Sequence, residues 1–424
     1  MDDALGARLP AWLADERLAW RVAFAATMAL GPALLAGRAI ADLLISLTGL
    51  LFLASRFARR AGGPRAAWNW AGRPWHALAL AFWVWQIATS IARGDGHQII
   101  ESVVLVRLFV FLAALEFWVL DSVFARRWFG WVMLATALWV GIECWQQYLT
   151  GFNAFHEPRW GDGSLTGPIR KPRAGETFVL LAFPAFLPVL VPLLERPARW
   201  ARIAGGAGVA MLLVTQVLIG QRMPTLLMLL GLAVAGLGLR RLRLPVAVAL
   251  AVGVALAALT RFVSPPTYYK LVVHFAQQMS HFMATQYAAL FERALAMIAA
   301  HPWLGLGFDG FRDHCLDAAY RHQLAWFPVA DPTSALGCSI HPHNYYLQVA
   351  TGAGLPGLAL FVGLGIAWLW RLGRGTGHSA RRLGPFVAAA IVLWPIASTT
   401  SFFTLPNVGW ILLAIGWGLA EARG

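Results

Sequence analysis

His343 and Asn344 have the clearest chemical potential in this chain, because they stand where a long polar stretch meets an apolar one. Gly354 and Gly357 follow within the apolar stretch, so the pattern indicates a loop that re-enters a membrane span at the histidine. An imidazole titrates near neutral pH and can accept a proton from a hydroxyl group. At a lipid–water boundary, His343 could therefore serve as general base toward a soluble substrate or a membrane-anchored one.

Arg222 and Arg293 could hold a pyrophosphate if both faced one cavity at the same boundary. Two guanidinium groups can stabilise the charge that develops on a departing lipid diphosphate, a role that a metal ion often fills. His341-Pro342-His343 is an awkward zinc pair because proline separates the two histidines. The acidic residues of the loop lack the paired spacing of a magnesium site: Glu292, Asp309, Asp313, Asp317 and Asp331. We therefore expect a mechanism without metal or cofactor.

The composition identifies the elements that must position these residues. Hydrophobic residues make up 59% of the chain, charged residues 13%, and the mean hydropathy is +0.62, which together indicate an all-α polytopic membrane protein. Apolar runs long enough to cross a bilayer predict about 12 transmembrane helices. They lie near residues 20–35, 40–55, 76–91, 100–120, 128–149, 177–194, 203–219, 223–239, 244–263, 345–372, 383–401 and 405–420.

Basic residues between the runs predict the orientation, since Lys and Arg accumulate on the cytoplasmic side. With a cytoplasmic amino terminus, most arginine clusters fall inside, and twelve spans return the carboxy terminus to the cytoplasm. The inside set comprises Arg56, Arg59, Arg60, Arg65, Arg126, Arg127, Arg196, Arg199, Arg202, Arg240, Arg241, Arg243, Arg374, Arg381 and Arg382. The orientation of the spans and contacts with lipid headgroups then explain the net charge of +14, which gives no argument for nucleic-acid binding.

This topology places a few basic residues on the periplasmic side, and these are the candidates for a functional role. Arg170, Lys171 and Arg173 precede the sixth span, and Arg222 occupies the turn before the eighth. The alternative is structural, because a boundary arginine commonly reaches for lipid phosphate and a loop histidine is commonly only solvated. Arg107 lies within a span and is expected to pair with Glu101 or Glu143.

The spans divide the chain into three parts: transmembrane helices over 1–263, a large periplasmic loop over 264–342, and transmembrane helices over 343–424. Within the loop, the spacing of apolar residues predicts a helix over 281–300. No cleavable signal peptide is evident at the amino terminus. Cys315 and Cys338 lie in the loop, where oxidising conditions would permit a bridge.

Three segments together resemble the O-antigen ligase and polymerase superfamily of bacterial envelope glycosyltransferases. They are His343-Asn344 with Gly354 and Gly357, His301-Pro302 with Gly305, Gly307 and Phe311, and the Gln221-Arg222 turn, where the family often has a small hydroxyl residue before the arginine. The resemblance covers about the second half of the chain.

The resemblance implies a GT-C-like architecture in the bacterial inner membrane and transfer at its periplasmic face. A preassembled glycan would pass from undecaprenyl pyrophosphate to a sugar hydroxyl of lipid A-core, with inversion at the anomeric carbon. His343, Arg222 and Arg293 would be catalytic, and Arg170, Lys171, Arg173, Asn344 and His301 would bind substrate. The only other partners expected are membrane lipids.

Three other functions fit parts of the sequence. A polymerase would use a second lipid-linked glycan as acceptor, but the His-Asn spacing and a single large outer loop favour a ligase. A protein O-oligosaccharyltransferase usually carries an additional carboxy-terminal segment. A lipid or solute transporter would place its polar residues near the midplane and show internal repeats.

Overall fold

The computed structural model describes residues 16–58, 72–396 and 400–423, and these residues form helices joined by turns and loops, without a β-strand. Three arginines that the topology prediction places inside, Arg59, Arg60 and Arg65, lie outside the described residues. Nine helical runs within the described residues are long and apolar enough to cross a membrane. The chain is therefore an all-helical polytopic membrane protein.

The nine runs follow the predicted spans closely. They are α2 (Glu16–Ala36), α3 (Arg38–Ala58), α5 (Pro74–Arg93), the run of α6 (Gly96–Val104), α7 (Val106–Ala114) and η3 (Leu115–Val119), α8 (Val123–Thr150), α9 (Ala174–Glu195), α10 (Arg199–Ile219), α12 (Arg243–Val263) with the preceding turn η4 (Arg240–Leu242), and α17 (Tyr345–Gly373).

The other three predicted spans correspond to shorter helices, α11 (Arg222–Gly238), α18 (Ala380–Val392) and α19 (Asn407–Glu421). The expected helix over 383–401 is wrong at its carboxy end, since α18 stops at Val392. Pro395 explains this early end, because proline lacks an N–H and disfavours helical backbone in the residue before it. The predicted segment also includes 397–399, which lie outside the described residues.

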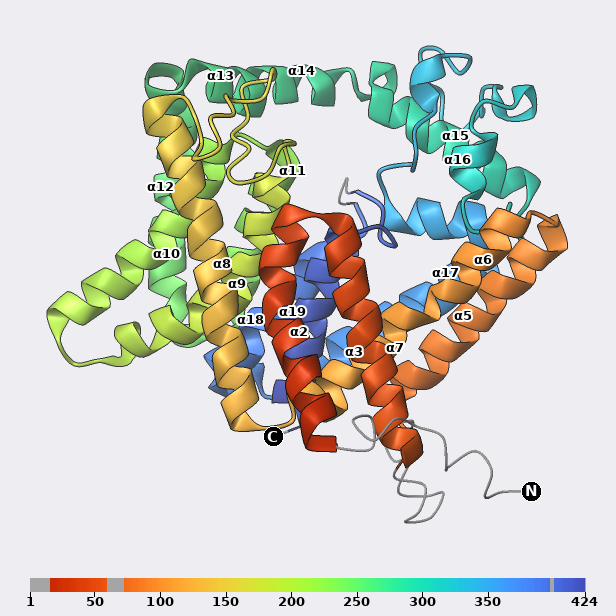
Figure 1. Cartoon of the computed structure of the whole chain (residues 1–424). Coiled ribbons are helices and arrows are strands. Elements are labelled where there is room, and N and C mark those ends of the chain that lie inside the picture. The colour runs from red at the N-terminus through yellow and green to blue at the C-terminus, as the bar shows by residue number, and fades with distance from the viewer. Residues whose placement is uncertain (1–15, 59–71, 397–399, 424) are drawn as a thin grey trace.

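Both ends of the described chain lie at the same end of the bundle. The Trp20 indole near the start of α2 donates to the Trp118 carbonyl at 3.2 Å, and Arg423 after α19 pairs with Asp121 at 3.1 Å. Residues 118 and 121 flank the same turn before α8. The long loop lies at the opposite end, at the top of Figure 1.

Two apolar cores hold the membrane helices together. One is built mainly from α2, α3, α5, α7, α17 and α19, and the other from α9, α10, α11, α12 and α18. Arg107 of α7 is tied to this framework through Asp42 of α3, with 2.9 Å between Nε and Oδ1. The expected pairing of Arg107 with Glu101 or Glu143 is therefore wrong: Glu101 lies 3.6 Å from His97, and Glu143 accepts from the Ala154 amide.

The loop between α12 and α17 lies over one end of the bundle and has a small core of its own. Helices α13 (Pro265–Tyr268) and α14 (His274–Ser280), with η5 (Tyr269–Val273) between them, cross the top of the bundle toward η6 (Phe282–Ala284) and α15 (Gln286–Ala300). Leu290, Ala294 and Phe311 are buried in this core together with Cys315, which forms a disulfide with Cys338.

The helix expected over 281–300 begins only at Gln286. Thr285 provides the reason, because its backbone is extended and its hydroxyl accepts from the Ala288 amide at 3.2 Å, as in an N-cap. The rest of the loop is formed by α16 (Gly310–His314), η7 (Ala318–Tyr320), η8 (Ala335–Gly337) and turns.

Candidate active site

His343 lies at the junction between the loop and α17, as the sequence predicts. Its backbone is left-handed, with φ of +53°, although it is not a glycine. Histidine adopts this conformation more readily than most residues, but it is still uncommon and is often found at functional sites. The half-buried ring packs edge-on against Tyr287 of α15, with ring centroids 5.9 Å apart.

Asn344 fixes the position of this histidine by capping α17. Its side-chain oxygen accepts from the Tyr346 and Leu347 amides at 2.9 and 3.2 Å, and its Nδ2 donates to the Pro395 carbonyl at 2.9 Å. The side chain is 8% exposed. Asn344 therefore positions the start of α17, because its side-chain amide is hydrogen-bonded to these backbone groups.

Arg222 is the first residue of α11, in the turn where the sequence places it. Its guanidinium donates to Gln278 of α14. Burial lowers the pKa of Lys270, the hydrogen bond and charge of Asp162 raise it, and the positive charge of the nearby Arg222 lowers it further. Lys270 also bonds Ser164, so it ties the loop between α8 and α9 to the crossing segment.

Arg222 borders an apolar cavity of about 160 Å³ between α10, α11, α12 and the crossing segment. Leu226, Val254 and Phe275 are among its lining residues. A cation at the mouth of an apolar cavity suits a molecule with an anionic head and a hydrocarbon tail.

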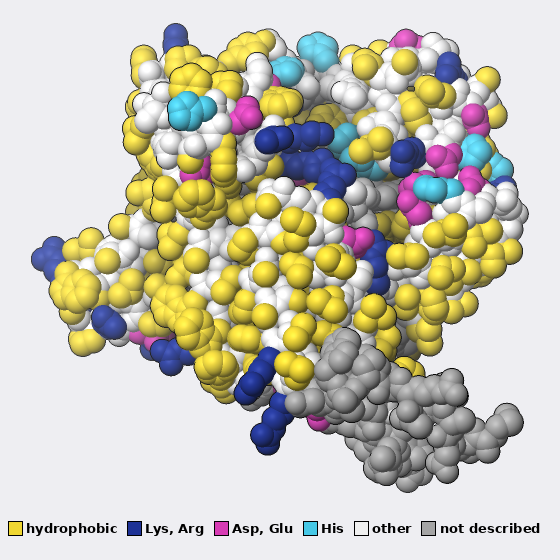
Figure 2. Space-filling view, in the orientation of Figure 1, with side chains coloured by type: hydrophobic (Ala, Val, Ile, Leu, Met, Phe, Trp, Pro, Cys, Tyr) yellow, Lys and Arg dark blue, Asp and Glu magenta, His cyan; other side chains and the backbone are white. Residues whose placement is uncertain are grey.

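Arg170, Lys171 and Arg173 lie just before α9, and the first two are exposed. Burial and the positive charge of Arg38 at the start of α3 lower the pKa of Arg173, whereas the carboxylate of Glu176 raises it. Figure 2 shows Lys and Arg side chains gathered in a hollow between the two upper lobes, with histidine side chains beside them. This end of the molecule therefore presents a basic surface.

Hydrogen bonds connect the start of α9 to the start of α17. Thr400 donates to Glu176 at 2.9 Å, and the neighbouring Ser401 accepts from Gln348 at 2.8 Å. Gln348 lies one turn after Asn344, whose carbonyl accepts from the Gln348 amide at 2.9 Å. Arg173 and His343 thus belong to neighbouring, linked parts of the structure.

Arg293 is placed differently from the sequence expectation. The side chain is 1% exposed and points into the loop's interior, where its guanidinium donates to the carbonyls of Cys315, Pro332 and Ser334. None of the cavities identified among the described residues has Arg293 in its lining. Arg222 borders one of these cavities and Arg293 borders none of them, and the carbonyl contacts of Arg293 are those of a residue that holds the loop's segments in place.

His301 also connects structural elements. Its Nε2 lies 2.8 Å from the Tyr320 hydroxyl, and its Nδ1 lies 3.2 Å from the guanidinium of Arg93, at the end of α5. Burial, followed by the charges of Arg93 and His314, lowers the pKa of His301. A neutral ring that accepts from Arg93 and donates to Tyr320 satisfies both contacts.

The glycine-rich segment after His301 fits against a break in α17. Gly354 interrupts the helix with φ of +67°, and a Cβ there would lie 2.3 Å from the Trp303 carbonyl oxygen. The Gly307 amide donates to the Gly352 carbonyl at 2.9 Å across the same contact. The two glycine-containing segments thus form one unit that places the loop on α17.

One group of side chains among the described residues could hold a metal ion. Ligand atoms of His97, Glu101 and Asp309 all lie within 4.8 Å of one another. Burial and the charges of Glu101 and Asp313 raise the pKa of Asp309 to about 6. Spacing along the sequence does not predict this group, because its members come from two segments distant in the chain.

Sequence reasoning also missed two basic residues at this end of the molecule. Arg38 and Arg93 follow the first and third spans, so the topology rule that singled out Arg222 puts them outside as well. Applying the rule at every turn would have identified both. Gln221, the residue before Arg222, accepts from the Gly175 amide at 3.1 Å and so anchors the Arg222 turn to α9.

The helical bundle places the chain in the class of polytopic membrane proteins, with a basic surface and a left-handed histidine at one end. The comparison with protein families is more specific. Residues 207–362, just over a third of the chain, match the family model described as O-antigen ligase, which supports membership of the O-antigen ligase superfamily.

Members of this superfamily are glycosyltransferase-like enzymes that act on lipid-linked glycans. The matched segment includes Arg222, Arg293, His301, His343 and Asn344 but excludes the basic cluster before α9. The comparison with curated proteins finds no match.

Proposed function

We propose that this protein is an O-antigen ligase of the bacterial inner membrane. It transfers a preassembled glycan from undecaprenyl pyrophosphate to a sugar hydroxyl of lipid A-core at the periplasmic face, where residues 264–342 form the loop. Both termini lie in the cytoplasm. The observation that carries the proposal is His343, held in a left-handed conformation at the loop–helix junction inside the segment that matches the O-antigen ligase family.

In this proposal His343 accepts the proton of the acceptor hydroxyl as the oxygen attacks the anomeric carbon. The bond from that carbon to the diphosphate breaks, and the configuration inverts in a single displacement. Arg222 stabilises the departing diphosphate, and the apolar cavity beside it receives the first part of the lipid chain.

The remaining predicted residues take supporting roles. Arg170, Lys171 and Arg173 attract the diphosphate or the phosphorylated acceptor through the basic surface before α9. Arg293, Asn344 and His301 position the loop and the catalytic histidine through the contacts described above. The reaction is proposed to need no metal.

The test uses purified full-length protein with undecaprenyl-pyrophosphate-linked O-antigen and rough lipopolysaccharide. His343→Asn is the informative variant because asparagine also tolerates left-handed backbone, whereas alanine does not. His322→Asn, an exposed loop histidine, is the matched control. We expect a product ladder from the wild type and the control in excess chelator, and none from His343→Asn.

Other outcomes would change the assignment. A ladder from His343→Asn at the wild-type rate would refute a base role for this residue. Loss of the wild-type ladder in chelator would implicate a metal, and the group at His97, Glu101 and Asp309 would be the first place to look.

A polymerase is the second candidate, and one observation favours it. The segment 151–173 between α8 and α9 is a further folded outer loop, joined to the large one through Lys270 and Asp162. Extension of the lipid-linked donor without modification of lipopolysaccharide would support this function.

A further inference from the structure

A cavity lies at the end opposite the candidate active site. It has a volume of about 510 Å³ and lies between α8, α9, α18 and α19. Helix α9 connects the two ends, since it starts beside Arg173 and lines the cavity near its last turn. Its 22 residues span about 33 Å, close to the thickness of a bilayer's hydrocarbon core.

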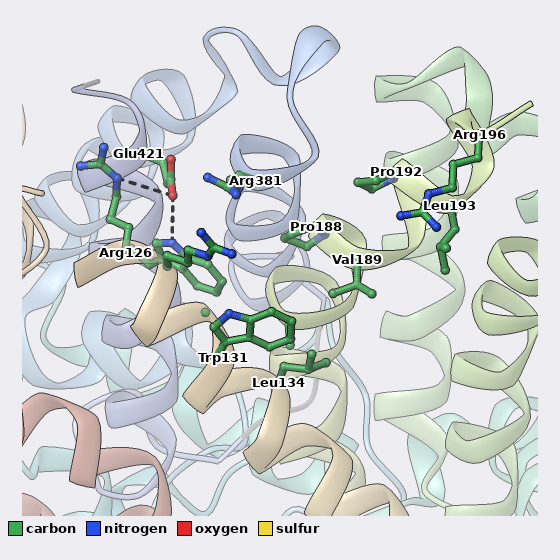
Figure 3. A pocket seen from close by; sticks show the side chains of 14 residues that line it. Arg126, Trp131, Leu134, Pro188, Val189, Pro192, Leu193, Arg196, Arg381 and Glu421 are labelled. Atoms are coloured by element: carbon green, nitrogen blue, oxygen red, sulfur yellow. Dashed lines mark hydrogen bonds and ion pairs between the residues drawn. The ribbon is translucent and has the colours of Figure 1, made fainter. Parts of the chain in front are cut away.

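Four arginines surround the mouth of this cavity: Arg126, Arg127, Arg196 and Arg381. Figure 3 shows Arg126, Arg196 and Arg381 around it, with Glu421 beside Arg126. Glu421 is the only acidic residue in the lining.

Arg126 is structural, because Glu421 lies 3.6 Å from its Nε and the carbonyls of Leu120 and Asp121 accept from its Nη1. Arg127, Arg196 and Arg381 are exposed, and no ion pair is recorded for them among the described residues. The cavity mouth therefore has three cations available to an external anion.

A second cavity of about 480 Å³ adjoins the first and shares Arg126, Arg381 and Glu421 with it. It adds Arg382 and His378 to the lining. The positive surface is thus wide enough to serve two anionic groups carried by one molecule.

The floor of the first cavity is apolar. Trp131 and Leu134 of α8 face Val189 and Leu193 of α9 across it, as Figure 3 shows. Prolines at 184, 188 and 192 recur along one face of α9, and each removes a backbone donor, so the helix can bend away from α8. An apolar groove below a ring of arginines matches an amphiphile, whereas a soluble anion would make no use of the groove.

We propose that these cavities bind an anionic glycerophospholipid from the leaflet at this end of the protein. The phosphates contact Arg127, Arg196 and Arg381, and an acyl chain lies along the groove between α8 and α9. Basic pockets between membrane helices favour lipids of this kind, and each arginine near the surface contributes about 1 kcal/mol. Since two cavities adjoin, a lipid with two phosphates binds more tightly than a lipid with one.

The test is native mass spectrometry of the full-length protein titrated with cardiolipin, phosphatidylglycerol or phosphatidylcholine. A triple variant, Arg127→Gln with Arg196→Gln and Arg381→Gln, removes the available cations. A matched variant, in which Arg199, Arg202 and Arg240 are changed to Gln, removes the same charge from the same end, and none of these three residues lines either cavity. Val189→Trp fills the groove and leaves every arginine in place.

We expect cardiolipin to bind best and phosphatidylcholine worst. The cavity triple variant should lose at least about tenfold in cardiolipin affinity, since three arginines are removed, and Val189→Trp should also weaken lipid binding severalfold. The matched triple variant should bind like the wild type.

Equal losses in the two triple variants would overturn the proposal, because general charge attraction would then explain the binding. Unchanged lipid affinity in Val189→Trp would overturn the placement of the acyl chain, and that variant tests the proposal even if the cavity triple variant fails to fold. Displacement of bound cardiolipin by millimolar inorganic phosphate would show a site for free phosphate instead.

Discussion

Replacing Arg293 with alanine should destabilise the outer loop before it affects chemistry. The guanidinium is 1% exposed and donates to three backbone carbonyls, including that of Pro332 at 2.8 Å and that of Ser334 at 3.3 Å. The three carbonyls belong to chain segments at the ends of short helices and in turns: Cys315 follows α16, and Ser334 precedes η8 and also accepts from the Gly337 amide at 3.1 Å. Arg293 thus joins segments that are distant in the chain.

The size of the effect follows from these contacts. A hydrogen bond to a charged group contributes about 1.5–3 kcal/mol, and water can solvate part of the exposed loop once the side chain is gone. We expect Arg293→Ala to cost about 3–5 kcal/mol in loop stability. Lysine should recover less than half, because a single ammonium group cannot span three carbonyls as a planar guanidinium does.

A second variant displaces the guanidinium without removing it. A Cβ at Gly337 would lie 3.0 Å from Arg293 Nη2 and 3.2 Å from the Ala289 carbonyl oxygen. Gly337→Ala should therefore cost about 1–2 kcal/mol by crowding. Arg312→Ala is the control, since Arg312 is an exposed loop arginine 3.5 Å from Asp309 and surface pairs contribute less than about 1 kcal/mol.

Thermal unfolding and limited proteolysis of the loop measure stability, and glycan transfer is assayed on the same preparations. Loss of protease resistance over 315–334 in Arg293→Ala, with Gly337→Ala in between and Arg312→Ala unchanged, would support the positioning role. An Arg293→Ala protein that unfolds and resists protease like the wild type, yet transfers no glycan, would refute this reasoning and make Arg293 a direct substrate contact.

Three further predictions concern other parts of the same end. Gly354→Ala should cost at least about 3 kcal/mol because it combines left-handed backbone with a backbone clash, and normal expression and melting temperature would contradict the described break in α17. The pKa of Asp309 is raised from 3.8 to about 6, so the wild-type protein should lose stability as the pH rises from about 4 to 6. In thermal unfolding, Asp309→Asn should be more stable than the wild type by at most about 3 kcal/mol at pH 7.5 and equally stable below pH 4. Lys270→Met and Asp162→Asn should be non-additive by about 1 kcal/mol in a double-mutant cycle of unfolding, whereas additive effects would show that their ion pair does not join the two outer loops.

The sequence predicted the membrane architecture well because hydropathy is a local signal. Each expected span overlaps a helical run, and Arg222 lies in the turn assigned to it. The helix ends were less accurate, since they depend on specific local chemistry. Thr285 delays the start of α15, and Pro395 follows the early end of α18.

The partners of charged residues could not be predicted in the same way. Arg107 meets Asp42, which lies 65 residues away in the chain, because α3 packs on α7. Arg293 meets backbone carbonyls, and these leave no trace in side-chain types. Sequence spacing therefore identified charged residues at unusual positions, but it could not distinguish those that bind other parts of the protein from those that face a substrate.

The hydrogen-bond partners of an arginine distinguish a structural arginine from a ligand-binding one better than its position along the chain does. An arginine has five N–H donors and no acceptor, so carbonyl or carboxylate partners inside the protein leave fewer donors for a ligand. Arg293 and Arg126 donate to several carbonyls and are buried, which suits residues that hold a loop or a helix end. Arg170 and Arg127 are exposed at opposite ends of the protein, Arg170 just before α9 and Arg127 at the mouth of an apolar groove. The same residue type thus serves the proposed glycan donor at one face and the proposed lipid at the other, and substitution of the exposed arginines should change ligand affinity with little change in folding.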